Sequence, residues 1–399
     1  MGLTLPSAPG IRWEVTTVTK IQEIFSFGWE DYCSSFHPSD VQAKAARSIL
    51  SCKTGKLGCN VSVCGDCGHL EFHNNSCRDR NCPNCQAVLK EVWIDQRRSE
   101  VIEGPYFHVV FTIPAQLNAL VYSNQRLLYA ALHKSSSETL LELASNPKYL
   151  GAVPGIIQVL HTWGQKLNYH PHIHCIVSGS GLSADGKLKT CGKHFFLPAR
   201  VIATKFRGKL LSSIDTFYKN GKLTFSASCR ELQDPAKWAD LRDSLYRKEW
   251  CPDIRETFNG FGNAIEYLGR YAHRIAITNA RITEVTGDSV TFTAKDYKNG
   301  SAIKEVTLSH KEFIRRFMMH VLPSGFQKIR YYGFLCNRSK KENLKRIFRL
   351  QGHQRYHSRL QGLSIGEILM QVWKYDIRIC PECGCCSMRH AGKSYSPWE

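Results

Sequence analysis

Two closely spaced pairs of cysteines stand in the first quarter of the sequence. Cys64 and Cys67 form one Cys-x-x-Cys pair, and Cys82 and Cys85 form another. Two thiolates from one tight turn reach one side of a Zn²⁺ ion at about 2.3 Å, and two such pairs complete a tetrahedron. A redox Cys-x-x-Cys motif comes singly beside a βαβ pattern, which this stretch lacks. We therefore expect these four cysteines to bind one structural Zn²⁺ ion.

Further metal-ligating residues lie nearby and leave alternatives open. A swapped ligand or a second ion is compatible with the spare side chains of the same stretch, which are Cys59, His69, His73 and Cys77. Near the C-terminal end, Cys380-x-x-Cys383 supplies only half of a tetrahedral site, so the sequence leaves open whether it binds a second zinc. Arg78 and Arg80 flank the second cysteine pair. We expect them to contact DNA phosphates; a solvated charged surface is the alternative.

A second constellation consists of histidines at alternate positions. His170, His172 and His174 precede an apolar run, and on a strand residues two apart share a face. Neutral imidazoles on one face are typical ligands of a divalent metal ion. We expect His172 and His174 to bind that ion. Gln165 is the predicted third ligand because it is neutral and lies in the preceding loop, with His161 as the alternative.

A third constellation is a pair of tyrosines. Tyr267 and Tyr271 are four residues apart, which on a helix places both phenols on one face. Such pairs ordinarily pack into a core. Here Gly269 interrupts the helix, and Arg270 and Arg274 lie where they would bind a phosphate. A phenol is a weak nucleophile until a metal polarises the phosphodiester that it attacks, so the two tyrosines are predicted nucleophiles, with Tyr271 favoured for the first attack.

The elements that must position these groups read as an α+β fold. Strand patterns at residues 107–113, 156–162 and 172–177, with a helix at 117–143, predict an antiparallel sheet with covering helices. Further helices are expected near residues 309–321, 340–350 and 364–373. The predicted domains are a helical segment at 1–50, a zinc-binding domain at 51–98, an α+β domain at 99–280 with an insertion at about 180–260, and a C-terminal DNA-binding or accessory region at 281–399 with the second cysteine cluster.

The amino-acid composition indicates which class of partner the protein binds. Lys and Arg number 53 and Asp and Glu 34, a net charge of +19 spread over 399 residues. This excess favours a polyanionic partner, with nucleic acid first. The sequence has neither a membrane-spanning apolar run nor a signal peptide pattern, so we expect a cytoplasmic protein without a membrane partner. The 17 cysteines then indicate metal binding and not disulfides. The oligomeric state stays open.

Taken in order, these motifs resemble the two-tyrosine HUH transposases of the insertion sequence 91 type. The resemblance runs from about residue 50 to 386 and rests on the blocks Ser76-Cys-Arg-Asp-Arg-Asn-Cys-Pro-Asn-Cys85, His161-Thr-Trp-Gly-Gln165, His170-Pro-His-Ile-His174, Tyr267-Leu-Gly-Arg-Tyr271, Phe313-Ile-Arg-Arg-Phe317 and Arg330-Tyr-Tyr-Gly333. Asn81 departs from the pattern, where a His is expected.

The resemblance implies a rolling-circle transposase that acts on single-stranded DNA in bacteria. One tyrosine would attack the backbone at a transposon end, forming a 5′-phosphotyrosine and freeing a 3′-hydroxyl, and the other would serve strand transfer. The family's HUH nuclease fold is an antiparallel sheet with helices, and its catalytic metal is Mg²⁺ or Mn²⁺.

Three alternatives remain at this stage. A replication initiator or conjugative relaxase would share the same chemistry and differ in its DNA context. A histidine-triad nucleotide hydrolase is suggested by His170-x-His172-x-His174, although it needs neither paired tyrosines nor zinc. A zinc protein that only binds DNA would have no use for aligned imidazoles and phenols.

Overall fold

The computed structural model describes residues 18–192, 197–250, 252–256, 265, 269, 275–296, 300–352 and 357–394. Its centre is an antiparallel sheet with the strand order β11-β4-β5-β3-β7, and β6 (Leu188–Thr190) pairs with the far end of β5. The main strands are β3 (Tyr106–Thr112), β4 (Val153–Trp163), β5 (Tyr169–Leu182), β7 (Asp253–Glu256) and β11 (Ile329–Gly333). Their central stretches are rich in Val and Ile, which suit a pleated surface buried on both faces. The predicted α+β class and its three strands are confirmed.

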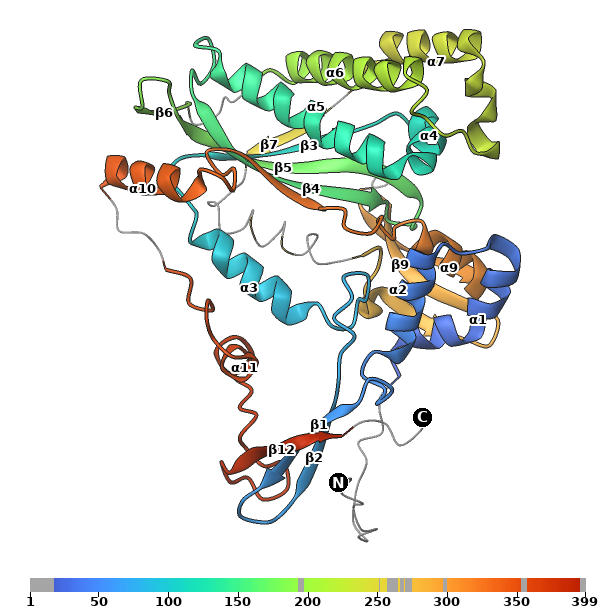
Figure 1. The fold of residues 1–399 in the computed structure, drawn as a ribbon, viewed down its shortest axis with the longest axis vertical. Helices are drawn as coiled ribbons and strands as arrows, with labels where there is room; N and C mark the ends of the chain where they lie inside the picture. The colour runs from blue at the N-terminus through green and yellow to red at the C-terminus, as the bar shows by residue number, and fades with distance from the viewer. Residues whose placement is uncertain are drawn as a thin grey trace.

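One face of this sheet is covered by helices that lie between its strands in the sequence (Figure 1). They are α4 (Asn118–Ser123), α5 (Gln125–Ser145), α6 (Ala199–Lys219) and α7 (Pro235–Arg247). Alternate strand residues such as Phe111 and Ile173 point into the same apolar cluster as Phe206 and Trp238. The segment predicted as an insertion at about 180–260 supplies α6 and α7 to this core, and β7 forms a sheet edge.

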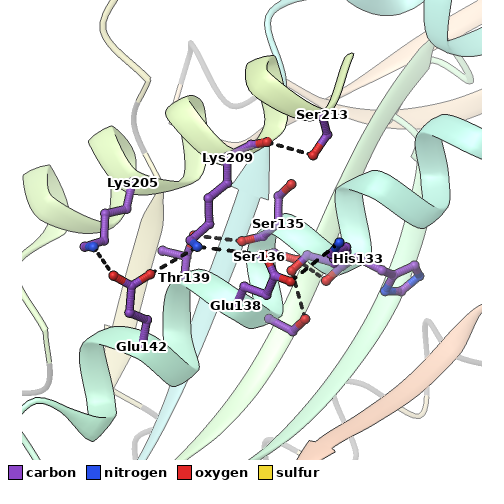
Figure 2. A network of polar contacts seen from close by, with 11 residues as sticks. His133, Ser135, Ser136, Glu138, Thr139, Glu142, Lys205, Lys209 and Ser213 are labelled. Carbon is purple, nitrogen blue, oxygen red and sulfur yellow. Dashed lines mark hydrogen bonds and ion pairs between the residues drawn. The ribbon is translucent and has the colours of Figure 1, made fainter. Parts of the chain in front are cut away.

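Helices α5 and α6 are also joined by polar contacts at their outer surfaces (Figure 2). Lys205 and Lys209 of α6 both pair with Glu142 of α5, the latter at 3.1 Å. Inside α5, the buried hydroxyl of Thr139 donates to the carbonyl of Ser135, which satisfies it within the helix. The ion pairs join the outer surfaces of α5 and α6, whose inner faces pack in the shared apolar core.

The opposite face of the sheet packs against α3 (Ala87–Arg98) and α10 (Lys340–Gln351). Ile157 and Ile176 of the sheet share a core with Ile94 of α3 and Ile347 of α10. Ile265 is buried in the same cluster. Gly269 lies against α3 so closely that a Cβ atom there would come within 2.4 Å of Ile94 Cγ1. A glycine is therefore required at this position by the close approach of α3.

A second, smaller body forms beside the sheet (Figure 1). It combines α1 (Lys20–Phe36) and α2 (Asp40–Ser51) with α9 (His310–Met318) and the antiparallel sheet of β8 (Ile282–Val285), β9 (Ser289–Asp296) and β10 (Ala302–Ser309). Phe25 of α1 packs edge-to-face on Phe317 of α9, with ring centroids 5.5 Å apart. The helices expected in residues 1–50 are confirmed within 18–51.

The C-terminal region predicted at 281–399 is not one unit. The elements β8, β9, β10 and α9 pack with the N-terminal helices. In contrast, β11 is a strand of the central sheet and α10 packs on that sheet. Beyond α10, α11 (Ile365–Trp373) leads to β12 (Met388–Ser394), which pairs with β1 (Cys59–Cys64) in a three-stranded sheet completed by β2 (Leu70–Asn74). Within the described part of the chain, no helix has the length and apolar character needed to cross a membrane.

Candidate functional site

Three histidines meet on the α3-facing side of the central sheet. In the β4–β5 pair, His161 stands opposite His172 and Val159 stands opposite His174. Residues directly opposite one another, and residues two apart on one strand, share a face of a sheet. One ligand nitrogen from each of His161, His172 and His174 can therefore be chosen so that all three lie within 4.8 Å of one another.

The environment keeps these imidazoles neutral. His161 is 2% exposed, and His172 and His174 are nearly as buried. Burial lowers the pKa of His172 to about 4 and holds the pKa values of His161 and His174 well below the ordinary value, and the neighbouring histidines add to the effect. Neutral imidazole is the metal-binding form, so the cluster is ready to coordinate a cation at neutral pH.

Partners on the far side of two of these rings fix their orientation. The Nδ1 atom of His172 lies 2.7 Å from the carbonyl oxygen of His170, to which it donates. The Nδ1 atom of His174 lies 2.8 Å from Nε2 of His108 on β3. In metal-bound histidines one ring nitrogen is usually held by such a partner while the other binds the metal. His108 is not among the residues predicted from the sequence. It lies two residues before Val110 on β3, and the two side chains therefore share this face of the sheet.

Gln165, the predicted third ligand, lies elsewhere. It sits in the turn between β4 and β5, and its side-chain oxygen accepts from the backbone N–H of Lys295 at 3.5 Å. The β4–β5 register brings His161, the alternative ligand, to His172 and His174, and the role of Gln165 stays a prediction. His170 contributes its carbonyl to the arrangement and is not among the clustered ligand atoms.

The predicted nucleophiles Tyr267 and Tyr271 and the predicted phosphate ligands Arg270 and Arg274 lie outside the described residues. Their assignments stay predictions from the sequence.

A cavity of ≈ 570 Å³ lies beside Trp163, next to β4 and β11. Trp163 lines it and stacks on His161, with ring centroids 4.8 Å apart. Lys328 also lines the cavity, with Nζ 4.9 Å from the centre of the Trp163 ring. Burial, with Arg80 nearby, lowers the pKa of Lys328 to about 7. The other aromatic and cationic lining residues are Arg80, His320, Phe326, Arg330, Tyr331 and Tyr332. Such a mixture suits unstacked bases and phosphates.

The cysteines form two separate clusters. Cys82 and Cys85 gather with Cys52 and Cys77, all four sulfurs lying within 4.8 Å of one another. Cys77 Sγ is 3.7 Å from Cys85 Sγ. The predicted site of Cys64, Cys67, Cys82 and Cys85 is therefore corrected. The turn after α2 and the loop after β2 bring Cys52 and Cys77 to the second Cys-x-x-Cys pair. Cys64 and Cys67 lie instead beside Cys380 and Cys383.

The two arginines of the cysteine-rich stretch differ in their surroundings. The Arg80 guanidinium donates to the carbonyl oxygens of Phe326, at 2.6 Å, and of Pro323, at 2.7 Å. It thus fastens the cysteine-rich loop to the segment before β11, and its predicted phosphate contact stays a prediction. Arg78 is exposed, with a φ of 53°, and its predicted DNA contact stays a prediction.

Comparisons with known proteins point to one kind of protein. Residues 155–343 match a family described as "Putative transposase", and residues 24–113 match a "Transposase zinc-binding domain". The chain is 42% identical over 315 residues to a putative transposase, y4qJ, of Sinorhizobium fredii, covering 79% of each chain. It is 29% identical over 312 residues to the transposase for insertion sequence element IS801 of Pseudomonas savastanoi pv. phaseolicola, covering 77% of this chain and 74% of that one.

Among solved structures, the conjugative relaxase TrwC in complex with oriT DNA, in a metal-bound form, aligns at 12% identity over 42% of this chain and 71% of that one. The TM-score is 0.23, which does not establish a shared fold.

Proposed function

Because this chain belongs to the family of insertion sequence 91 type transposases, we propose that it cleaves and rejoins single-stranded DNA through a covalent tyrosine–DNA intermediate. The observation that carries the proposal is the buried cluster of His161, His172 and His174, with ligand atoms within 4.8 Å. A structural core has no need of three buried imidazoles on one face. A phosphoryl-transfer site needs them to hold a cation.

The residues present fit a divalent cation. The backbone carbonyl of His170 and the ring of His108 contact the Nδ1 atoms of His172 and His174, and partners of this kind orient metal-bound imidazoles. When bound, Mg²⁺ or Mn²⁺ would polarise the scissile phosphate and stabilise the charge that develops on it. The three histidines would hold the ion, and the sheet would keep them in register before DNA arrives.

The nucleophile in this proposal is Tyr267 or Tyr271. The phenol oxygen forms a bond to phosphorus as the bond from phosphorus to the 3′-oxygen breaks, and the phenol proton leaves to solvent or a nearby base. The products are a 5′-phosphotyrosine and a free 3′-hydroxyl. Attack of a 3′-hydroxyl on that ester reverses the step without ATP, so the second tyrosine lets one site serve two DNA junctions.

The cavity beside Trp163 is the proposed binding place for nucleotides next to the cleaved bond. Its aromatic lining offers stacking surfaces that any base can use, and Lys328 and Arg330 offer positive charge to phosphates. Because Trp163 stacks on His161, a nucleotide in this cavity would lie next to the metal-binding cluster.

The test is a cleavage assay on oligonucleotides derived from the transposon ends, with Mg²⁺ or Mn²⁺. We expect a single-stranded substrate to yield a protein–DNA adduct that survives denaturing electrophoresis, and a fully duplex substrate of the same sequence to yield far less. Cleavage that leaves both DNA fragments free of protein would contradict the covalent mechanism, and equal cleavage of the duplex would contradict the single-strand preference.

A further inference from the structure

We propose that a second Zn²⁺ ion, held by Cys64, Cys67, Cys380 and Cys383, clamps the C-terminal arm of the chain to its N-terminal zinc-binding domain. The matched zinc-binding family covers residues 24–113, so it includes Cys64 and Cys67 but neither of the C-terminal ligands. The inference rests on the sulfur geometry alone and does not depend on the proposed DNA chemistry.

The four sulfur atoms have the spacing of a tetrahedral zinc site. Cys64 Sγ lies 3.6 Å from Cys383 Sγ, and Cys67 Sγ lies 3.7 Å from Cys380 Sγ. All four lie within 4.8 Å of one another. Zinc–sulfur bonds of about 2.3 Å in a tetrahedron place sulfurs about 3.8 Å apart. A disulfide would bring two sulfurs to about 2.05 Å, so these pairs are spaced for coordination and not for oxidation.

The two cysteine pairs are built on matching turns. In the first, the N–H of Gly68 donates to the carbonyl of Cys64 at 3.1 Å; in the second, the N–H of Gly384 donates to the carbonyl of Cys380 at 2.9 Å. Both glycines have a φ of +73°, a conformation that other residues rarely adopt. Each turn presents two thiols on one side, and together the two turns surround a common point.

The fold around the site is too small to hold itself together. The strands β12, β1 and β2 form a three-stranded sheet, and Cys64 pairs with Met388 in its register. The buried apolar cluster of this module, within the described chain, is Cys64, Cys380 and Met388. A core of this size does not offset the entropy of ordering the strands, whereas zinc binding supplies folding free energy directly.

The clamp would fix the path of the chain between α10 and β12. In Figure 1 this arm runs from the central sheet along α3 to the three-stranded module. Its upper part is held by Asp95 of α3, whose carboxylate accepts from the backbone N–H of Leu360 at 2.9 Å. Its lower end is held by β12 and the proposed zinc ion. The arm is therefore held at two points, one on α3 and one at the three-stranded module, and the proposed zinc ion lies at the second point.

An all-sulfur ligand set selects zinc or iron among the common metals, and we commit to zinc, as in the neighbouring cluster of Cys52, Cys77, Cys82 and Cys85. The chain offers matched controls in the same loop. Cys385 and Cys386 are exposed and stand outside the cluster of four.

The experiment measures zinc per full-length chain by elemental analysis and native mass spectrometry. We expect two zinc ions in the wild-type protein, one in Cys380→Ser, one in Cys82→Ser, and two in Cys385→Ser. Double substitutions distinguish the grouping of cysteines in the structure from the grouping predicted from the sequence. Cys64→Ser with Cys380→Ser should lose one ion because both residues serve one site, whereas Cys64→Ser with Cys82→Ser should lose both.

Limited proteolysis guards against general misfolding. In Cys380→Ser, residues 375–394 should become sensitive to protease while the central sheet stays resistant. X-ray absorption of the wild-type zinc should show sulfur ligands at both sites. One zinc ion per wild-type chain, two in Cys380→Ser, or iron in the C-terminal site would overturn the proposal.

Discussion

His161 and His172 stand directly opposite each other on β4 and β5, with ring centroids 5.3 Å apart. The pairing is antiparallel and contains a bulge between His161 and Trp163. On the turn side of this bulge, the pairing of β4 with β5 is shifted by one residue relative to the pairing that includes His161. His161 lies before the bulge, in the regular register of residues 156–161 with 172–177, and therefore shares a face with His172 and His174. The third histidine of the cluster is therefore a residue of β4, held by the backbone hydrogen bonds between β4 and β5, and not a residue of the adjoining turn.

The first prediction separates His161 from Gln165. His161→Ala should abolish metal-dependent cleavage and weaken Mn²⁺ binding at least 10-fold, because it removes one of three clustered ligands. Gln165→Ala should change both by less than twofold. Isothermal titration with Mn²⁺ and the cleavage assay, run on proteins with unchanged zinc content, measure the two effects. Full activity in His161→Ala, or loss in Gln165→Ala alone, would return the role to Gln165.

A second prediction concerns His108 as a positioning residue for His174. His108→Phe removes the nitrogen that lies 2.8 Å from His174 Nδ1, and such partners typically change metal affinity by about 10- to 100-fold. We expect a weaker Mn²⁺ affinity of this size and partial rescue in His108→Gln, which restores a polar partner. His170→Ala is the matched control because it keeps the carbonyl that accepts from His172. An effect of His170→Ala as large as that of His108→Phe would contradict the assignment.

The third prediction follows from Lys328, whose pKa burial lowers to about 7. Below this pH the ammonium is protonated and attracts phosphate; as pH rises through 7 the charge is lost, so affinity for single-stranded DNA should fall between pH 6 and 8. Lys328→Met should flatten this dependence and reduce the slope of log affinity against log salt by about 0.7 at pH 6. Fluorescence anisotropy measures both quantities.

Lys237→Met provides the comparison for Lys328, since Lys237 is exposed on α7, beyond the other face of the sheet. It should keep the pH dependence of the wild-type protein. If Lys328→Met and the wild type share one pH profile, the cavity does not bind the DNA backbone.

A fourth prediction tests the close approach at Gly269. An added methyl group would lie 2.4 Å from Ile94 Cγ1, so Gly269→Ala should lower the free energy of unfolding by about 1 to 3 kcal/mol through overpacking. In an Ile94→Ala background the same substitution should cost much less, because the space is then free. Urea denaturation of the four proteins of this double-mutant cycle measures the coupling. Equal costs in the two backgrounds would mean that Gly269 does not lie against α3 in solution.

The sequence predicted those features that depend on local periodicity. Apolar runs rich in β-branched residues at 107–113 and 172–177 predict both strands, and the His-x-His spacing by itself places His172 and His174 on one face. The contribution of His108 depends on the pairing of β3 with β5, which are separated along the chain by two helices and β4. Periodicity within one strand carries no information about such a register.

The cysteine groupings show the same limit more sharply. Each Cys-x-x-Cys turn is visible in the sequence, yet the choice between Cys82 and Cys380 as a partner for Cys64 is made by the sheet that joins β12 to β1. Cys64 and Cys383 are 319 residues apart. Spacing can identify half of a zinc site, but only the fold shows which halves meet.

The most direct test of the account is peptide mapping of the DNA adduct. Wild-type protein, the two single variants Tyr267→Phe and Tyr271→Phe, and the double variant are incubated with single-stranded end DNA and Mn²⁺, digested, and analysed by mass spectrometry. The account predicts a nucleotide linked through a 5′-phosphate to Tyr267 or Tyr271 in the wild type. It also predicts a different failing step in each single variant and no adduct in the folded double variant, since Phe keeps the packing and removes the nucleophile. An adduct or metal-dependent cleavage that persists in the double variant would contradict the two-tyrosine mechanism.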